Sequence, residues 1–251
     1  MGARSPPRLR YKAPMARHDD RTVDQLRPVR LETGFVSSAA GSCLVSFGRT
    51  RVLCVATVDG STPKWLAGRG QGWVTAEYSM LPGCSNERVA REAAKGKIKG
   101  RTYEIQRLIA RSLRACVDLT ALGERQVIVD CDVIEADGGT RTASITGGYV
   151  ALALALRSIE VAETALIRSV SAVSCGIVGD DALLDLDYSE DHDADVDMNF
   201  VITDAGGLVE VQGTAEGDPF SVDDLQSMLG LAQGGCARLT ELQRKALAAA
   251  Q

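Results

Sequence analysis

The chain has 251 residues, of which 45% are hydrophobic and 24% charged, and its net charge is −5. This composition indicates a globular protein with a large core, and one broad domain is favoured over two. The longest apolar run, residues 149–156, is far shorter than the roughly 18 residues of a membrane span, so we expect no membrane segment.

Residues 1–17 are rich in Arg and Pro and lack the apolar stretch of a secretory signal, so we expect a disordered extension followed by a folded domain over residues 18–251. The seven cysteines include no Cys-x-x-Cys pair, which argues against a disulfide framework or a zinc site. Buried, reduced thiols fit a cytoplasmic protein. With only two histidines, His18 and His192, Ser-His-Asp catalysis is disfavoured.

The spacing of apolar residues predicts alternating strands and helices. In the first half we expect a hairpin over residues 41–58, a strand over 73–81, a helix after the glycines of 94–101, a strand over 126–137 and a helix over 145–159. In the second half we expect strands at about 168–178, 182–188, 197–203 and 208–213, and a helix at about 222–248 that Ser221 and Asp224 cap. This order predicts an α/β (α+β) fold of mixed sheets packed with helices, and it does not indicate a doubly wound dinucleotide fold.

The charged residues are distributed unevenly along the chain. Nine basic and two acidic residues lie between positions 88 and 114, whereas nine carboxylates and no Lys or Arg lie between positions 180 and 199. Charge runs are often only solvated surface. Because both runs occur in a chain that also has a glycine-rich turn, they favour a polyanionic substrate and a divalent metal ion.

The glycine-rich turn is DGGTRTAS, residues 137–144, between a predicted strand and a predicted helix. Two glycines let the backbone approach an anion, and the amides at the start of a helix favour negative charge. The hydroxyls of Thr140, Thr142 and Ser144 are further donors, and the guanidinium of Arg141 matches phosphate oxygens. A capped turn without a ligand would explain one hydroxyl but not the arginine. Because the Gly-Lys-Ser/Thr of an ATP-binding loop is missing, the turn predicts a site for inorganic phosphate.

The acidic run has an aspartate at every second position from 191 to 197, like the start of a calcium-binding loop. Val196 stands where such a loop needs glycine, and Ile202 stands where it needs glutamate, so calcium is not expected. The alternative is an exposed acidic strand edge that discourages aggregation. We expect that role for Asp193 and Asp195.

Several segments in series make the chain similar to the bacterial ribonuclease PH family, phosphorolytic exoribonucleases that trim the 3′ ends of tRNA precursors. These segments are GQGWVTAEYSMLP at 70–82, GRTYEIQRLIARSLRACVDL at 100–119, DGGTRTASITGG at 137–148, VDMNFV at 196–201 and EVQGTAEGDPF at 210–220. The resemblance runs from about Gln25 to the last predicted helix. It implies two related β-α units packed into one domain, a ring of six subunits built from dimers, and a requirement for phosphate and Mg²⁺.

The resemblance also implies roles for individual residues. Phosphate binding falls on Gly139, Thr140, Arg141 and Arg101, catalysis and Mg²⁺ binding on Asp191 and Asp197, and RNA binding on Arg88 and Arg91. The chain departs from the family at Gly83, where the loop after the strand often has another basic residue, so the RNA path is expected to be weaker or rearranged.

Phosphorolysis requires this combination of charges, because a phosphate dianion must approach a phosphodiester that is itself negative. The repulsion at contact amounts to several kcal/mol at an effective dielectric constant of about 20. Arg101 and Arg141 can neutralise and aim the attacking phosphate, and a Mg²⁺ on Asp191 and Asp197 can stabilise the departing 3′ oxygen. One of the two carboxylates can instead be the general acid that protonates this oxygen, and both roles stay open.

Two other functions remain open from the sequence. The first is a ring subunit that binds RNA without degrading it, but such a subunit is expected to lack Arg141 or Asp197. The second is a metal-dependent nuclease that uses water, which would leave the Gly-Thr-Arg turn without a purpose. The expected products of phosphorolysis are a nucleoside diphosphate and an RNA shortened by one nucleotide.

Overall fold

The structure is a computed structural model that describes residues 17–92, 96 and 99–250. The strands are β1 (Val29–Thr33), β2 (Gly41–Phe47), β3 (Thr50–Asp59), β4 (Trp73–Met80), β5 (Gln126–Glu135), β6 (Val170–Val178), β7 (Asp181–Leu184), β8 (Val196–Thr203) and β9 (Leu208–Ala215). The helices are α1 (Gly100–Arg114), α2 (Leu119–Leu122), α3 (Thr140–Ser158), α4 (Ala162–Ala165), α5 (Tyr188–Asp193) and α6 (Val222–Ala249).

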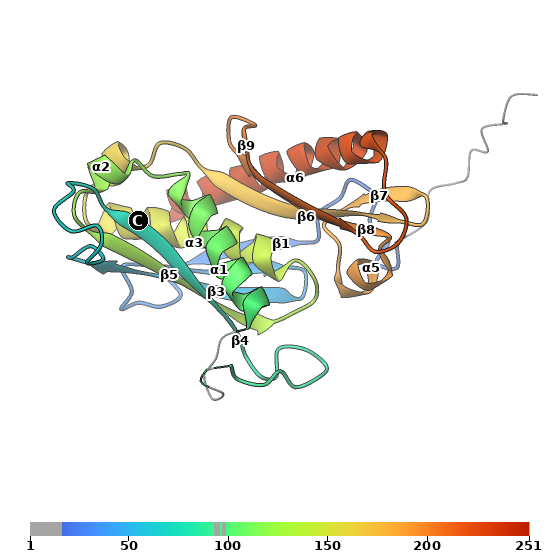
Figure 1. Cartoon of the computed structure of the whole chain (residues 1–251), viewed down its shortest axis with the longest axis horizontal. Helices are drawn as coiled ribbons and strands as arrows, with labels where there is room; N and C mark the ends of the chain where they lie inside the picture. Colours follow the sequence, from blue (N-terminus) through green and yellow to red (C-terminus); the bar gives the residue numbers. More distant parts are fainter. Residues whose placement is uncertain (1–16, 93–95, 97–98, 251) are drawn as a thin grey trace, which may run out of the picture.

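The strands form two sheets, one in each half of the chain (Figure 1). The first sheet has the order β1-β2-β3-β5-β4, and its only parallel pair in the described part of the chain is β4 with β5. The second sheet has the order β7-β6-β8-β9 and is antiparallel throughout. Helix α3 packs against both sheets, α1 covers β4, and α6 packs on the second sheet. The expected fold of two β-α units with mixed sheets packed by helices is confirmed.

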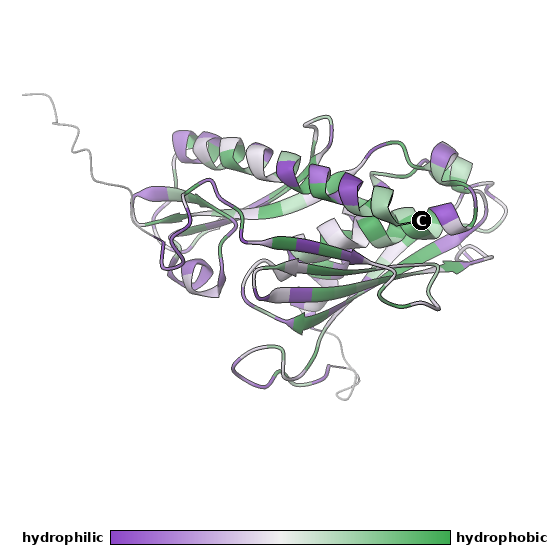
Figure 2. Ribbon diagram, turned by 180° about the vertical axis from the view of Figure 1, so that it is seen from behind, coloured by the Kyte–Doolittle hydropathy of each residue, from purple (hydrophilic) through white to green (hydrophobic). Residues whose placement is uncertain are grey.

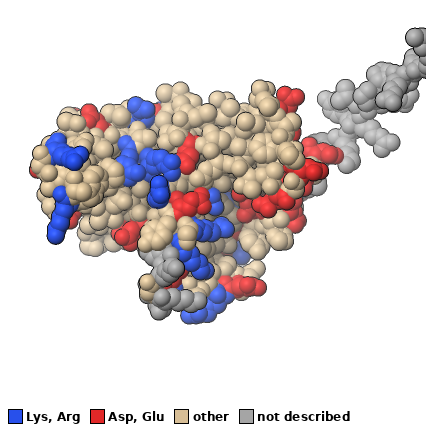
Figure 3. Space-filling model, viewed as in Figure 1, with Lys and Arg blue, Asp and Glu red and all other residues tan. Residues whose placement is uncertain are grey.

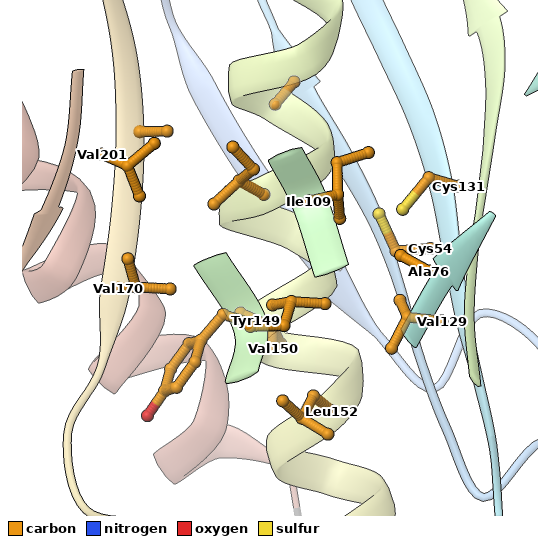
Figure 4. Close-up of a cluster of buried hydrophobic side chains, with 14 of the residues drawn as sticks. Cys54, Ala76, Ile109, Val129, Cys131, Tyr149, Val150, Leu152, Val170 and Val201 are labelled. Atoms are coloured by element: carbon orange, nitrogen blue, oxygen red, sulfur yellow. The ribbon is translucent and has the colours of Figure 1, made fainter. Parts of the chain in front are cut away.

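Alternating burial along the strands turns one face of the first sheet toward α3. On β5 every second residue from Val127 to Val133 is at most 1% exposed, so the period of two in the sequence produces one apolar face. In Figure 4, Val129 and Cys131 from this face lie beside Ile109 of α1, with side chains of α3 and the second sheet in the same cluster. Figure 2 shows the same pattern as hydrophobic bands along the strands. One core therefore joins both halves.

The expected elements match the observed ones over most of the chain, with two corrections. Helix α3 begins at Thr140 rather than at residue 145, because nothing after Gly139 interrupts the helix. The expected strand over residues 182–188 ends at Leu184, because Asp185 takes a left-handed conformation (φ 54°) that no regular strand contains. The next residues start α5, which the sequence patterns did not predict.

The described residues begin with Arg17, the last residue of the expected extension. Residues 1–16 lie outside the described residues, but Arg17 is 4% exposed and binds Glu190 through Nε and Nη2, at 2.6 Å and 2.5 Å. All seven cysteines, which lie in the described part of the chain, are buried, as expected. Within the described residues, the helices are too short or too polar to cross a membrane.

Candidate active site

The turn between β5 and α3 needs both of its glycines. Gly138 and Gly139 have φ angles of 75° and 66°, a region that side chains rarely adopt. A Cβ atom on Gly138 would also lie 2.6 Å from the carbonyl carbon of Asp187, so the turn packs directly against the backbone that leads into α5. The glycines thus serve the contact between the two halves of the protein, whether or not they also serve an anion.

The hydroxyl groups that follow the turn have different partners. Thr142 donates to the carbonyl oxygen of Gly139 at 2.9 Å, and Ser144 donates to that of Thr140 at 2.8 Å. Both side chains are buried, so they satisfy backbone groups of α3 and are not placed to bind phosphate, contrary to expectation. The hydroxyl of Thr140 lies 2.8 Å from that of Tyr78 on β4.

Arg141 lies in the first turn of α3, and its side chain is 20% exposed. Its Nη1 atom lies 3.4 Å from Oε1 of Gln212 on β9 and 3.9 Å from Oε1 of Glu104 on α1. Gln212 is itself oriented by Glu210, whose Oε1 accepts its amide at 3.1 Å. Residues from both halves of the protein therefore hold the guanidinium in a partly desolvated position.

Arg101 is the second residue of α1 and is exposed. The start of this helix is fixed by Glu92, whose carboxylate accepts from the backbone N–H of Lys99 at 3.1 Å and from the hydroxyl of Thr102 at 3.0 Å. Burial raises the pKa of Tyr78, while its hydrogen bond with Thr140 and the positive charges of Arg101 and Arg141 act to lower it. Both arginines therefore lie close enough to Tyr78 to act on the same hydroxyl.

Asp191 and Asp197 come from neighbouring elements of the second half. Helix α5 begins with a capping box formed by Asp187 and Glu190, and the backbone N–H of Asp191 donates to the carbonyl of Asp187 at 2.8 Å. Asp197 is the second residue of β8. The capping box therefore fixes where the short helix places Asp191, close to the start of β8.

Arg101 and Arg141 lie close enough to Asp191 and Asp197 for their positive charges to affect the pKa of both carboxylates. Burial raises the pKa of Asp197 to about 6, with a further contribution from Asp191, while Arg141 and Arg101 act to lower it. Burial also raises the pKa of Asp191, which keeps contact with solvent, and the same two arginines oppose this shift. The fold thus brings four residues that are distant in sequence within electrostatic range of one another.

The carboxylates suit a divalent cation, because Mg²⁺ prefers oxygen ligands and would offset both the burial of Asp197 and its repulsion from Asp191. The described residues contain a second cluster of possible metal ligands. Its ligand atoms lie within 4.8 Å of one another and belong to His18, Asp187 and Glu190. There, Glu190 is already paired with Arg17 and lies 3.3 Å from Arg21. Two positive charges occupy that cluster, so it is an ion-pair network and not the better metal site.

Arg88 and Arg91 are exposed in the loop after β4. Arg91 lines a cavity of about 270 Å³ that also includes Tyr78 and Thr102, so it borders the candidate site. Figure 3 shows basic side chains over the middle of the face that carries α1, and acidic ones toward α5. The two charge runs of the sequence therefore share one face, although part of the basic loop, residues 93–95 and 97–98, lies outside the described residues.

Other basic and aromatic side chains have partners within the chain. The Nε atom of Arg111 lies 3.1 Å from Oε2 of Glu210. The guanidinium of Arg114 lies 4.4 Å from the ring centroid of Trp73, a cation–π contact. Trp65 meets Trp73 edge to face, with ring centroids 4.9 Å apart. Trp73 is therefore engaged in packing.

Sequence patterns missed three groups that shape the site, Tyr78, Gln212 and Glu210. Tyr78 occupies an alternating strand position that indicates burial alone. Gln212 and Glu210 lie on β9, far from Arg141 in sequence, and no local spacing indicates that they meet it. The one available signal is that these residues lie in two of the segments that resemble the family, residues 70–82 and 210–220.

Comparisons with known proteins match both halves of the chain to one family. Residues 25–157 match the 3′ exoribonuclease family, domain 1, and residues 169–235 match domain 2 of the same family. The first range ends near the end of α3, and the second covers the second sheet and half of α6. The two matched ranges therefore correspond to the two halves of the fold.

Solved structures share this fold at low sequence identity. Rice (Oryza sativa) Rrp46 has a TM-score of 0.76 and 20% identity, over 92% of this chain and 100% of that chain. The Archaeoglobus fulgidus exosome with RNA bound to the active site has a TM-score of 0.74 and 20% identity, over 90% and 91%. An archaeal exosome core has a TM-score of 0.71 and 21% identity, over 90% and 89%. The fold and the matched ranges together show that the chain belongs to the 3′ exoribonuclease (ribonuclease PH) family.

Proposed function

We propose that this protein is a phosphate-dependent 3′ to 5′ exoribonuclease that shortens RNA by phosphorolysis and trims the 3′ ends of tRNA precursors. The observation that carries the proposal is that the positive charges of Arg101 and Arg141 act on both Asp191 and Asp197. A site for water-driven hydrolysis would need the acidic groups but not two arginines beside a glycine turn at a helix N-terminus.

In the proposed reaction an oxygen of inorganic phosphate attacks the phosphorus of the last phosphodiester. A new P–O–P bond forms, the bond to the 3′ oxygen of the preceding nucleotide breaks, and a nucleoside diphosphate leaves. Arg141, held by Gln212 and Glu104, orients the phosphate and neutralises part of its charge, and Arg101 provides a second positive charge. Preorganised donors of this kind stabilise the charge that develops in the transition state.

The departing 3′ oxygen needs a proton. Burial raises the pKa of Asp197 to about 6, so its carboxyl can supply this proton when it does not hold a metal ion. When Mg²⁺ is bound by Asp191 and Asp197, it would supply positive charge to the scissile phosphate and the leaving oxygen.

The RNA is expected to approach along the basic face. Exposed Arg88 and Arg91 would bind its phosphates and contribute salt-dependent affinity. The family supports assembly into a ring, and we propose a hexamer of identical subunits acting in the cytoplasm. Two of the similar solved structures are exosomes, one of them with RNA bound to the active site, which supports RNA as the substrate.

One assay separates the proposal from its alternatives. An RNA with an unpaired 3′ tail is incubated with the protein and Mg²⁺, with and without inorganic phosphate. Nucleoside diphosphates that appear only with phosphate support phosphorolysis, whereas nucleoside monophosphates indicate hydrolysis. An RNA that is bound but not shortened indicates a non-catalytic ring subunit.

A further inference from the structure

A buried ion pair lies behind the glycine turn, between the two halves of the chain. Asp185 is 0% exposed and Arg27 is 4% exposed. The carboxylate of Asp185 accepts from the Nη2 of Arg27 at 2.7 Å, from its Nε at 3.1 Å and from its backbone N–H at 2.8 Å. Arg27 precedes β1, whereas Asp185 follows β7. The pair therefore connects the two β-α units directly.

The same guanidinium binds the turn of the candidate phosphate site. Arg27 donates through Nη1 to the carbonyl oxygen of Asp137, and its Nη2 lies 3.4 Å from that of Gly138. The hydroxyl of Thr50 also donates to the carbonyl of Gly138 at 2.7 Å and accepts from the N–H of Asp137 at 2.9 Å. The carbonyl side of the turn is thus held by the side chains of Arg27 and Thr50.

Fixing these carbonyls also fixes the amides. In a trans peptide the C=O and N–H groups point in opposite directions. Holding the carbonyls of Asp137 and Gly138 on Arg27 therefore directs the N–H groups of Gly138 and Gly139 away from it. Among the described residues these two N–H groups have no hydrogen-bond partner, and they lie beside the first turn of α3, which carries Arg141.

The pair also connects the turn to α5. Asp185 has a φ of 54°, and its backbone carbonyl accepts from Arg17 at 3.1 Å and from Arg21 at 2.8 Å. Two residues later Asp187 caps the start of α5, and Gly138 packs against the backbone of Asp187. The orientation of the turn and the start of the helix that carries Asp191 thus depend on the same buried contact.

We infer that Arg27 and Asp185 are positioning residues of the phosphate site, which orient the N–H groups of the β5–α3 turn and join them to the helix that carries Asp191. The inference rests on the proposed function, because it names residues that prepare the same site. Arg27 contacts the carbonyl oxygens of the turn, so its loss should loosen the N–H groups on the other side of these peptides.

The test is direct binding of inorganic phosphate to the full chain without RNA, measured by calorimetry, together with KM values for phosphate and for RNA. Arg27→Lys keeps the charge but has a single ammonium group, which cannot bind both carboxylate oxygens and both carbonyls. Arg27→Met/Asp185→Asn removes both charges, so no buried charge is left unpaired, and asparagine tolerates the left-handed conformation. Both variants should bind phosphate about 10-fold more weakly, the effect typical of lost supporting contacts, with the KM for RNA unchanged.

Gln243→Met is the matched control. Gln243 is 0% exposed and donates to the carbonyls of Thr146 and Val170 at 2.9 Å each, so this variant also loses two buried bonds to carbonyls, but away from the turn. It should lose stability and keep the phosphate affinity of the wild type. The inference is overturned if both Arg27 variants bind phosphate as the wild type does, or if Gln243→Met weakens binding equally. Wild-type protein that degrades RNA only to monophosphates and binds no phosphate would instead contradict the proposed function, and the inference with it.

Discussion

The hydroxyl of Tyr78 lies 2.8 Å from the hydroxyl of Thr140, so that β4 is hydrogen-bonded to the first residue of α3. Tyr78 is 5% exposed, and its raised pKa keeps it a neutral donor at physiological pH. If Tyr78 donates this bond, the hydrogen of the Thr140 hydroxyl is available to a bound phosphate. The hydrogen bond therefore fixes the orientation of the Thr140 hydroxyl in the proposed phosphate site.

We predict that Thr140→Val and Tyr78→Phe have different effects. Thr140→Val removes a donor to phosphate and should raise the KM for phosphate about 10-fold, the value of one hydrogen bond to a charged group. Tyr78→Phe should lower the free energy of unfolding by about 1 kcal/mol and leave this KM within a factor of about three. Steady-state kinetics and urea denaturation measure both effects. Equal KM values in the two variants would remove Thr140 from the phosphate site.

Arg141→Ala should keep the fold and lower turnover by about 10² to 10³, the cost of losing one preorganised donor. The side chain is partly exposed, and its contacts to Gln212 and Glu104 are long, so little stability is lost. Arg107→Ala is the control, because it removes the same charge from an exposed position on α1. Single-turnover rates at limiting phosphate are the measurement. Wild-type activity in Arg141→Ala would count heavily against the assignment.

The pKa of Asp197 predicts how stability changes with pH in metal-free protein. Its ordinary value is 3.8 and its value in the folded protein is about 6, so the folded state binds the proton more tightly than the unfolded state. The free energy of unfolding should therefore fall as the pH rises through this interval. Above it, Asp197→Asn should be more stable than the wild type, by at most about 3 kcal/mol.

At pH 4 the difference between Asp197→Asn and the wild type should be much smaller, because the carboxyl is then protonated in the folded state and partly protonated in the unfolded state. Urea denaturation in the presence of a chelator checks this at pH 4 and pH 8. Mg²⁺ should raise the unfolding temperature of the wild type at pH 8 and leave that of Asp197→Asn nearly unchanged. A variant that is less stable than the wild type at pH 8 would show that the carboxylate is stabilised in the folded state.

Basic residues near the loop after β4 should set the salt dependence of RNA binding. Arg88→Ala and Arg91→Ala should raise the apparent KM for long RNA and reduce the slope of log affinity against log salt by about one each. Gly83→Arg should have the opposite effect, because a side chain there meets no atom within 4 Å. Unchanged affinities across a salt series would exclude this loop from the RNA path.

Much of the fold follows from local sequence patterns. The alternation on β5 and the capping box of Ser221 and Asp224 on α6 depend on neighbouring residues, so periodicity and spacing could predict them. Helix α5 could not be predicted in this way. Its position depends on the left-handed conformation of Asp185, whose carbonyl accepts from the buried side chains of Arg17 and Arg21.

The candidate site shows the same division. The glycines and Arg141 belong to one short segment, so the turn was expected from local chemistry, although Thr142 and Ser144 prove to bond to the helix backbone. The contacts of Arg141 with β9 are long-range pairings that no spacing reveals. The position of Arg27 behind the turn is likewise a product of tertiary packing, since 110 residues separate it from Asp137.

The central claim is that inorganic phosphate is the attacking group. The most direct measurement uses phosphate labelled with ³²P, an unlabelled RNA with a free 3′ tail, and Mg²⁺, and it follows where the label appears. We predict labelled nucleoside diphosphates with the label in the β-phosphate. The Arg141→Ala variant should form them more slowly than the wild type. Unlabelled monophosphates as the only products, at the same rate with and without phosphate, would contradict the account.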